Sequence, residues 1–349
     1  MRKPKRDDTS AADARSAEEC RVLGRVCLVA VCVLCVWGVL YMPPAMRSGV
    51  ATRVTLPDHL AWMVSQSDVA LYVRPDNDTS FLAATPTSAT PTCNGSGVFL
   101  AVVVCSAVAN AGARNAIRDT WAQDAKHAGN LRVFFLLGKS PNDSLNALVS
   151  SESEKFGDII QQDFVDSYNN LTIKSVMMLK WATEHCSKAN FIMKTDDDMF
   201  VHLPNLFRLL KTKKKTAAKN LLLGCLIKGA TPVKDWHSKW YVPDSIFPGR
   251  VYPPYLSGTG YVLSRNAVTL LYRTALSTPF FYLEDVFVTG ICASRAGLSP
   301  TNHEGFKFYK RKSDTCAFRS LITAHRMSPK ELRQMWANIH NPSIKCKKS

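Results

Sequence analysis

Short apolar runs alternate with amphipathic segments along the last two-thirds of the chain. The run at 98–104 is apolar throughout, which is typical of a strand buried on both faces. The same patterns predict further strands at 131–137, 158–160 and 191–193, and helices at 113–122, 145–156 and 171–185. Strands that alternate with helices indicate an α/β domain with a largely parallel sheet. In such sheets, ligands bind beyond the carboxyl ends of the strands.

A different pattern lies near the amino terminus. Residues 26–42 form an uncharged apolar stretch that, with residues 22–24, approaches the length needed to cross a bilayer. Lysines and arginines are more numerous before this stretch than after it, so we expect a cytoplasmic tail at 1–21, a signal anchor at 22–42 and a lumenal remainder. A cleaved signal peptide is the alternative, but no clear cleavage site follows the stretch.

Residues 43–96 are rich in Pro, Thr, Ser and Asp, which predicts a lumenal stem before a catalytic domain at 97–349. Four acceptor sequons for N-glycosylation follow the anchor and agree with a lumenal location. Their asparagines are Asn77, Asn94, Asn142 and Asn170.

The charge of the chain narrows the class of partner. The 349 residues carry a formal charge of +16, which by itself would suggest nucleic acid. The anchor and the sequons argue against that partner. A basic lumenal domain instead suits diphosphate donors, acidic glycans or membrane phosphates, and the lysine-rich run at 211–215 is interpreted as a solvated helix end.

The lumenal part holds an odd number of cysteines, so at least one of them stays unpaired within the chain. An oxidising lumen favours disulfides among the others. These cysteines are Cys93, Cys105, Cys186, Cys225, Cys292, Cys316 and Cys346.

An acidic cluster follows the predicted strand at 191–193. Asp196, Asp197 and Asp198 are adjacent, so their carboxylates repel one another and gain proton affinity unless a cation intervenes. Hard oxygen ligands suit Mg²⁺ or Mn²⁺, which could stabilise a departing nucleoside diphosphate. A solvated turn is the alternative, but apolar residues on both sides of the cluster disfavour it.

Three further features suit the same chemistry. Asp285 lies between aromatic residues and an apolar stretch, where a carboxylate could be desolvated and act as a base; the alternative is an acidic helix start. Arg114 and Arg118 are one helical turn apart and could bind a diphosphate, or could be ordinary surface arginines. Gly258 and Gly260 allow close backbone approach to a sugar.

Six separated blocks, in order, give the chain a family resemblance. From residue 98 to residue 346 it resembles the β-1,3-glycosyltransferase family that contains β-1,3-galactosyltransferases and β-1,3-N-acetylglucosaminyltransferases. The blocks that carry the resemblance are 114–121, 134–138, 163–172, 194–198, 252–261 and 283–288.

The resemblance implies a GT-A type fold, in which a Rossmann-like nucleotide-binding half is fused to an acceptor half. It also implies an inverting enzyme of the Golgi membrane that depends on Mn²⁺ or another divalent cation. The enzyme would transfer a sugar from a UDP-sugar, in β-1,3 linkage, to a glycan acceptor on glycoprotein or glycolipid. Nucleic acid is not an expected partner.

The resemblance also implies roles for individual residues. The catalytic base is expected at Asp285, with Glu284 as second choice. The ion is expected at Asp198 and His325, with Asp196 contacting it directly, through water, or contacting ribose instead. The expected donor-binding residues are Arg114, Arg118, Lys194, Asp196, Asp197, Gly258 and Gly260.

The donor sugar is less closely specified. The pair Glu284-Asp285 resembles the galactosyl branch, whereas N-acetylglucosaminyl members more often carry Asp-Asp. UDP-N-acetylglucosamine is therefore the alternative donor, and a catalytically silent glycan-binding protein is an alternative of another class. Leu256 stands where many galactosyl relatives carry cysteine, which leaves the pairing of Cys225 open.

Overall fold

The computed structural model describes residues 91–93, 97–216, 219–310 and 314–346. The predicted tail and anchor, the sequons at Asn77 and Asn94 and nearly all of the predicted stem lie outside these ranges. Inside them, no helix is both long and apolar enough to span a bilayer. The anchor at 22–42 therefore stays a prediction.

A mixed sheet forms the centre of the described part of the chain. Its seven strands, in spatial order, are β3 (Ile159–Val165), β2 (Leu131–Lys139), β1 (Leu100–Cys105), β4 (Phe191–Asp196), β7 (Tyr255–Ser264), β6 (Leu222–Ile227) and β8 (Pro300–Asn302). Only β7 among them runs against its neighbours, so the prediction of a largely parallel sheet is confirmed. A separate antiparallel pair joins β5 (Phe200–Val201) to β9 (Thr323–Ala324).

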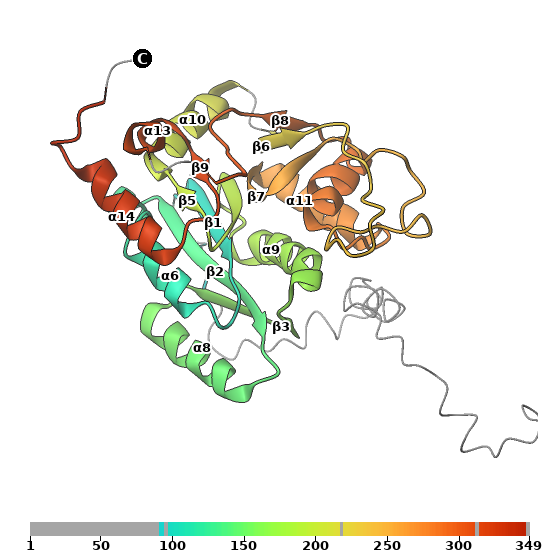
Figure 1. The fold of residues 1–349 in the computed structure, drawn as a ribbon, viewed down its shortest axis with the longest axis horizontal. Helices are drawn as coiled ribbons and strands as arrows, with labels where there is room; N and C mark the ends of the chain where they lie inside the picture. The colour runs from blue at the N-terminus through green and yellow to red at the C-terminus, as the bar shows by residue number, and fades with distance from the viewer. Residues whose placement is uncertain (1–90, 94–96, 217–218, 311–313, 347–349) are drawn as a thin grey trace, which may run out of the picture. The chain divides into compact units, whose positions relative to one another are not determined.

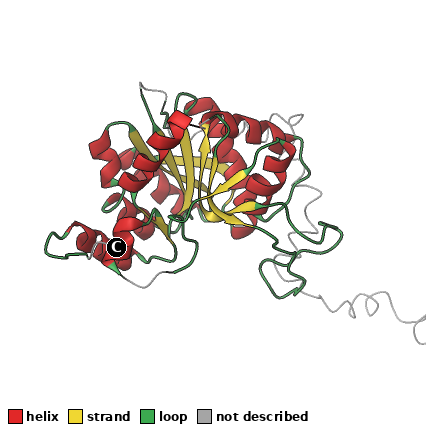
Figure 2. Cartoon of the chain, turned by 90° about the horizontal axis from the view of Figure 1, so that it is seen from above, coloured by secondary structure: helices red, strands yellow, loops and turns green. Residues whose placement is uncertain are grey.

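Helices cover both faces of the sheet, as Figures 1 and 2 show. One face carries α6 (Ala111–Arg118), α7 (Gln123–Ala128), α8 (Asp143–Phe156), α10 (Leu203–Thr216), α13 (Thr315–Ser320) and α14 (Pro329–His340). The other carries α9 (Leu171–His185), α11 (Arg265–Leu276), the π-helix η2 (Val286–Cys292) and α12 (Ala293–Arg295). The short 3₁₀ helix η1 (Tyr168–Asn170) leads into α9.

The central strand β1 shows why its sequence is apolar throughout. Leu100, Val102 and Val104 pack into the core beneath α6 and α10. Ala101 and Val103 point the other way, into the core beneath α9 and α11. Because successive side chains of a strand alternate between faces, a strand covered on both sides needs apolar residues at every position.

The predicted helix at 113–122 begins earlier and ends at Arg118. Trp121, beyond its end, is fully buried, and its indole N–H donates to the Met199 carbonyl at 3.0 Å. The predicted helix end near 211–215 is confirmed, because α10 ends at Thr216 and Lys211 is exposed.

Two disulfides close loops in the described residues. Cys93 pairs with Cys186, and Cys316 pairs with Cys346. Each stabilises the fold by restricting the unfolded chain, by about 4 kcal/mol for loops of this length. Three described cysteines, Cys105, Cys225 and Cys292, are free, which confirms that the odd number leaves at least one unpaired.

Candidate active site

Strand β4 carries the acidic cluster to the carboxyl edge of the sheet. Asp196 is its last residue, and Asp197 and Asp198 follow before β5 begins. Strand β1 lies beside β4 with Cys105 opposite Asp196, so the loop after β1 comes alongside the cluster. The antiparallel strand β7 begins at the same edge, because its residue Gly260 lies opposite Thr195 near the end of β4.

Asp196 and Asp197 have separate partners. The Lys194 ammonium donates to Asp196 Oδ1 at 2.6 Å. Asp197 Oδ2 accepts from Ser106 Oγ at 2.6 Å and from Asn110 Nδ2 at 2.9 Å. Burial raises the pKa of Asp197, and the charges of its acidic neighbours raise it further against the effect of these two hydrogen bonds. The predicted repulsion therefore contributes to the raised pKa of Asp197, but burial is the larger cause.

Asp198 lies beside His325, although 126 residues separate them in sequence. The pairing of β5 with β9 brings their two loops together, and the Met327 N–H donates to the Asp198 carbonyl at 2.8 Å. His325 Nε2 lies 3.2 Å from Asp198 Oδ2, while its Nδ1 donates to the Phe308 carbonyl at 2.7 Å. Burial lowers the pKa of His325, but the hydrogen bond and charge of Asp198 outweigh it, so the pKa is raised.

This pair fits a divalent cation. With Nδ1 committed to a carbonyl, Nε2 is the ring atom that faces Asp198, and in the neutral ring its lone pair is available to a cation. Both side chains reach solvent, at 44% exposure for Asp198 and 19% for His325. Within the described residues no group of three or more His, Cys, Asp or Glu side chains is arranged to hold a metal. The expected direct contact from Asp196 is not supported, because that carboxylate faces Lys194.

Lys194 joins the acidic cluster to a second acidic group. It is only 2% exposed, and its Nζ also donates to the Gly258 carbonyl at 2.5 Å and lies 3.6 Å from Glu284 Oε2. Burial alone would lower its pKa, but the charges of Asp196 and Glu284 raise it well above the usual value. Its ammonium contacts protein groups only, so in this structure Lys194 holds the two acidic groups together. It has no hydrogen-bonding capacity left for a nucleotide-sugar donor.

Glu284 and Asp285 form that second group, where β7 meets η2. Tyr261 donates its hydroxyl to Glu284 Oε1 at 2.7 Å. Asp285 accepts from the backbone N–H groups of Gly258 at 3.2 Å and Val286 at 2.9 Å. Burial, and then the charge of Glu284, raise the pKa of Asp285 to about 6 against these hydrogen bonds. The expected partial desolvation of this carboxylate is confirmed.

The two candidate glycines differ in how little room each leaves for a side chain. A Cβ at Gly258 would come within 2.9 Å of Glu284 Oε2 and 3.3 Å of Asp285 Cβ. A Cβ at Gly260 would make only ordinary contacts, of which the nearest is 3.5 Å from Met193. Close approach is thus required at Gly258, where the backbone contacts the carboxylates.

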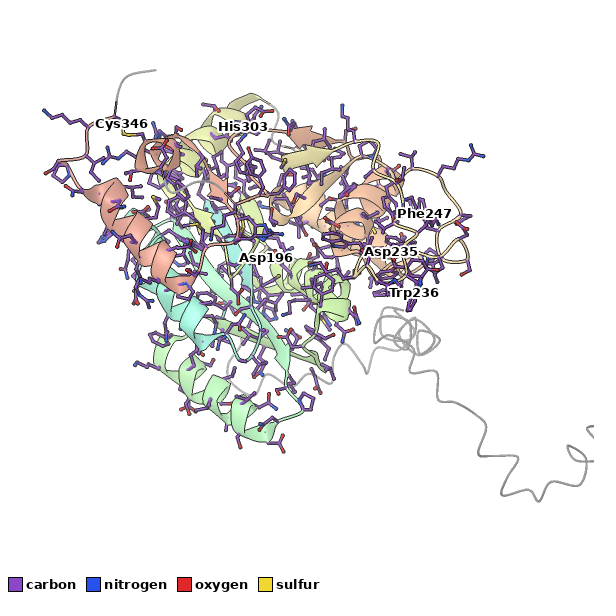
Figure 3. The ribbon with its side chains drawn as sticks, viewed as in Figure 1. Asp196, Asp235, Trp236, Phe247, His303 and Cys346 are labelled. Atoms are coloured by element: carbon purple, nitrogen blue, oxygen red, sulfur yellow. A yellow bond between two sulfur atoms is a disulfide. The ribbon has the colours of Figure 1, made fainter. Side chains whose placement is uncertain are left out.

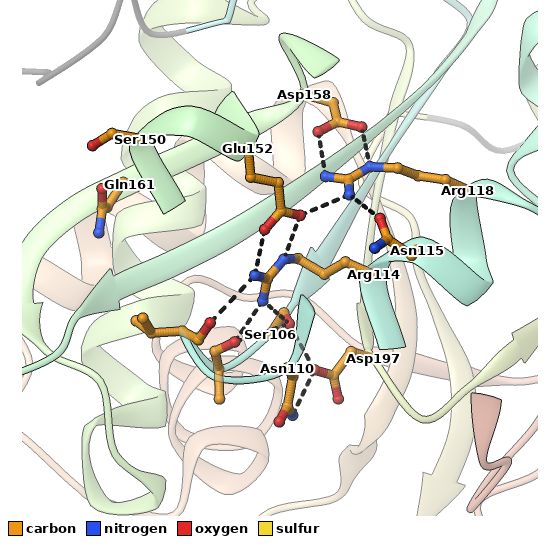
Figure 4. A network of polar contacts seen from close by, with 12 residues as sticks. Ser106, Asn110, Arg114, Asn115, Arg118, Ser150, Glu152, Asp158, Gln161 and Asp197 are labelled. Atoms are coloured by element: carbon orange, nitrogen blue, oxygen red, sulfur yellow. Dashed lines mark hydrogen bonds and ion pairs between the residues drawn. The ribbon is translucent and has the colours of Figure 1, made fainter. Parts of the chain in front are cut away.

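The two candidate arginines are part of a buried network, which Figure 4 shows. The five N–H groups of Arg114 donate to Glu152 twice, to Ser106 Oγ and to the carbonyls of Ala107 and Val108. The arginine is 1% exposed.

Arg118 forms a two-fold pair with Asp158 at 2.8 and 2.7 Å and a third bond to Glu152 at 2.7 Å. Its guanidinium also lies against the Phe135 and Phe156 rings. Direct donor binding by these arginines is therefore not supported, because their hydrogen-bonding capacity is spent on the protein. Arg114 supports the loop whose Ser106 holds Asp197.

A cleft of about 490 Å³ opens beside the acidic cluster. Its described lining consists of Ala109, Asn110, Gly112, Ala113, Asp197, Asp198, Arg326, Met327, Ser328 and Pro329. These residues come from the loop after β1, the start of α6, the acidic cluster and the segment before α14. Asp198, which lies beside His325, forms part of its wall.

Exposed aromatic rings come together from η1 and from the long loop between β6 and β7. The Trp240 indole, in the long loop between β6 and β7, donates to the Tyr168 hydroxyl at 3.1 Å, and the Lys239 ammonium lies over both rings. Burial raises the pKa of Tyr168, and the charge of Asp285 contributes, so the phenol is within electrostatic reach of that carboxylate. Figure 3 labels Trp236 in the same loop, and it is also half exposed.

Sequence reasoning missed Ser106, Asn110, Arg326 and the Tyr168–Trp240 pair as parts of the site. Ser106 and Asn110 follow directly after the carboxyl end of the first predicted strand, so the rule that ligands bind at that edge could have found them. Arg326 directly follows the predicted ligand His325, and Tyr168 lies in the block 163–172, but neither position shows by itself which groups the side chain contacts.

The two described sequons lie on turns before helices. Asn142 is exposed and caps α8, where its side chain accepts from the Ser144 N–H. Asn170 ends η1 and donates to the Val165 carbonyl at 2.7 Å. Glycosylation at these positions stays a prediction.

Comparisons with known proteins agree with one another on the family. Residues 112–304 match the family described as Galactosyltransferase. Human β-1,3-galactosyltransferase 1 is 40% identical over 249 residues, which cover 71% of this chain and 76% of that protein. The mouse acetylgalactosaminyl-O-glycosyl-glycoprotein β-1,3-N-acetylglucosaminyltransferase is 38% identical over 275 residues, covering 74% and 69% of the two chains.

Similarity to solved structures is weaker. One is a galactosyltransferase in complex with donor and acceptor sugar analogues, at 11% identity and a TM-score of 0.38, covering 69% of this chain and 96% of that chain. A bifunctional glycosyltransferase in its apo form matches with 12% identity and a TM-score of 0.39, covering 74% and 51%.

Proposed function

The chain belongs to the galactosyltransferase family and is a glycosyltransferase, and from that premise we propose that it transfers galactose from UDP-galactose to a glycan in β-1,3 linkage, with inversion. The relative at 40% identity, whose name gives this sugar and this linkage, supports the proposal. The proposal includes a GT-A type fold. The observation that carries it is the ion pairing of Lys194. This lysine joins Asp196, in the cluster that contains Asp198, to Glu284, the neighbour of Asp285, while Asp198 itself lies beside His325.

Asp198 and His325 would hold a divalent cation, for which Mn²⁺ is our proposal. A carboxylate oxygen and an imidazole nitrogen suit that ion, and two protein ligands leave coordination positions for diphosphate oxygens. When bound, such an ion acts as a Lewis acid toward the leaving nucleoside diphosphate. Asp197, fixed by Ser106 and Asn110, lines the cleft in which the nucleotide would lie.

Asp285 is the proposed general base. An inverting displacement needs a carboxylate on the acceptor side to take the proton from the attacking hydroxyl as the new bond forms. A pKa of about 6 leaves Asp285 largely ionised at neutral pH and still basic enough to accept that proton. The N–H groups of Gly258 and Val286 orient its two oxygens, one each.

A glycan acceptor suits the surface beside this base. The half-exposed rings of Tyr168 and Trp240 offer flat apolar faces with a hydroxyl and a cation close by. Sugars combine apolar C–H faces with hydroxyl edges, so such a surface can stack against one and hydrogen-bond to the other. The acceptor would be carried by a glycoprotein or a glycolipid.

A test is the release of UDP by the full-length protein in detergent, with UDP-galactose, UDP-N-acetylglucosamine and a panel of glycan acceptors. We expect galactose transfer that depends on Mn²⁺ and stops with EDTA. Preference for UDP-N-acetylglucosamine would support the alternative donor, which a relative at 38% identity favours. Glycan binding without any UDP release would contradict the proposal.

The proposed setting is the Golgi membrane, with residues 22–42 as a type II anchor and the catalytic domain in the lumen. The sequons at Asn142 and Asn170 make this testable, because only a lumenal domain receives N-glycans. Cells expressing the full chain should yield a protein whose mass falls after glycosidase treatment and which stays with membranes in carbonate. Release by carbonate would contradict the anchor.

A further inference from the structure

The cleft beside the acidic cluster has a specific charge arrangement. Asp197 and Asp198 line it together with the loop after β1 and the segment that leads into α14. Arg326 is the one cationic residue among the ten described residues that line it. The first turn of α6, at the same cleft, has no side-chain cap on its backbone N–H groups, because the Asn110 side chain bonds to Asp197 instead.

The guanidinium of Arg326 is exposed and forms no hydrogen bond or ion pair with any other described residue. The other cations near the cluster differ. Arg114 and Arg118 are committed to Glu152 and Asp158, and Lys174 is buried against Asp166 and the Ser106 carbonyl. Arg326 therefore has the hydrogen-bonding capacity that the two predicted arginines lack.

The backbone at Arg326 is held in an uncommon conformation. Its φ of +59° is the only positive value at a non-glycine residue in the described part of the chain. The left-handed region costs an ordinary residue on the order of 1 kcal/mol, so a chain keeps it where neighbouring contacts impose it. Here the His325 ring is bonded to the Phe308 carbonyl and the Met327 N–H to the Asp198 carbonyl, which fixes the residues on both sides.

We propose that Arg326 is the side chain that binds the diphosphate of the nucleotide donor. This proposal rests on the proposed function and deepens it. A planar guanidinium can donate two parallel hydrogen bonds to phosphate oxygens, and as a fixed cation it balances the charge that UDP carries as it leaves. The cation at Asp198 and His325 and the guanidinium of Arg326 would then contact the diphosphate from adjacent positions.

The test is calorimetric titration of UDP and of uridine into the full-length protein in detergent with Mn²⁺, comparing Arg326→Gln with the unaltered chain. Because the lost contacts are hydrogen bonds to a charged group, we expect the Kd for UDP to rise about 10- to 100-fold. The Kd for uridine, which has no phosphate, should stay the same. Arg326→Lys should fall between the two proteins, because it keeps the charge and loses the planar fork.

The matched control is Arg273→Gln, an exposed arginine in the last turn of α11 on the other face of the sheet, which should leave UDP binding unchanged. Arg326→Gly separates side chain from backbone. Glycine accepts the left-handed conformation, so this variant should bind UDP as weakly as Arg326→Gln and unfold at the same temperature as the unaltered chain or higher.

Three outcomes would overturn the proposal. Equal UDP affinity in Arg326→Gln and the unaltered chain would overturn it alone. An equal loss of UDP and uridine binding would also overturn it alone, because the effect would not depend on phosphate. Failure of the unaltered protein to bind UDP at all would overturn the proposed function together with this inference.

Discussion

Lys194 contacts two acidic groups, the cluster after β4 and the pair Glu284-Asp285, and these groups differ in exposure and in hydrogen-bond partners. After β4, Asp198 is 44% exposed and faces the imidazole of His325 beside a cleft. At the start of η2, Glu284 is 6% exposed and Asp285 is held by two backbone N–H groups, with its pKa raised by burial to about 6.

The difference teaches how carboxylates of the same chemistry acquire different roles. An exposed carboxylate beside an imidazole suits a cation. An enclosed carboxylate, close to another negative charge, holds protons more tightly and suits proton transfer. Lys194 contacts both groups and so fixes the distance between them. The predictions below test whether the two groups are as different in function as they are in environment.

The largest expected effect comes from removing the exposed carboxylate of Asp198. Asp198→Ala should lower the rate of UDP release by about 1,000-fold or more, because the proposed cation loses one of its two protein ligands. The measurement is turnover against Mn²⁺ concentration, together with calorimetric binding of Mn²⁺ and UDP. Asp163→Ala is a matched control, since that aspartate is also 44% exposed but pairs with Lys139 on β2. Full metal-dependent turnover in Asp198→Ala would remove the cation from this site.

Removing the partly buried carboxylate of Asp285 should lower turnover and leave the binding of UDP unchanged. Asp285→Asn keeps the size of the side chain but removes the base, so kcat should fall by about 100-fold or more. Binding of UDP should be nearly unchanged. If Asp285→Asn turns over normally and Glu284→Gln does not, the base is Glu284, and the assignment within the pair is reversed.

The pH dependence follows from the raised pKa of Asp285. The base acts only when ionised, so kcat/KM should be level above about pH 6 and fall about tenfold for each pH unit below it. Glu284→Gln removes a negative charge that raises this pKa, so its midpoint should lie at lower pH than in the unaltered chain. A midpoint near 4 in the unaltered chain would mean that burial does not raise the pKa of Asp285 in solution.

The smallest expected effect concerns the buried hydrogen bond that holds the backbone next to Asp198. Trp121 donates its indole N–H to the carbonyl of Met199, the residue that follows Asp198. Trp121→Phe removes this buried hydrogen bond and should lower the free energy of unfolding by about 1 to 3 kcal/mol, measured by denaturant titration. Trp236→Phe, at a half-exposed site, is the control and should change it little. Equal stability of the two variants would show that the hydrogen bond contributes nothing.

Much of the fold was predictable because its signals are local. The strand at β1 needed apolar residues on both faces, and α9 was predicted with the bounds it has, 171–185. The acidic cluster was placed at a strand end because the apolar run stops just before it. The arginines of α6 were interpreted less well. Their spacing does put both on one side of a helix, but that side faces Glu152 and Asp158 of the fold and not a ligand.

The sequence by itself determined the alternation of strands and helices up to β4 and the position of the acidic cluster at the carboxyl end of a strand. Those properties follow from periodicity and from side-chain types within a few residues of one another. Tertiary structure alone decided that Asp198 meets His325, that Asp285 is partly buried and that Arg326, not Arg114, has an unpaired guanidinium. Each depends on which strands and loops pack together across long stretches of chain, and burial and partners then determine what an ionisable side chain can do.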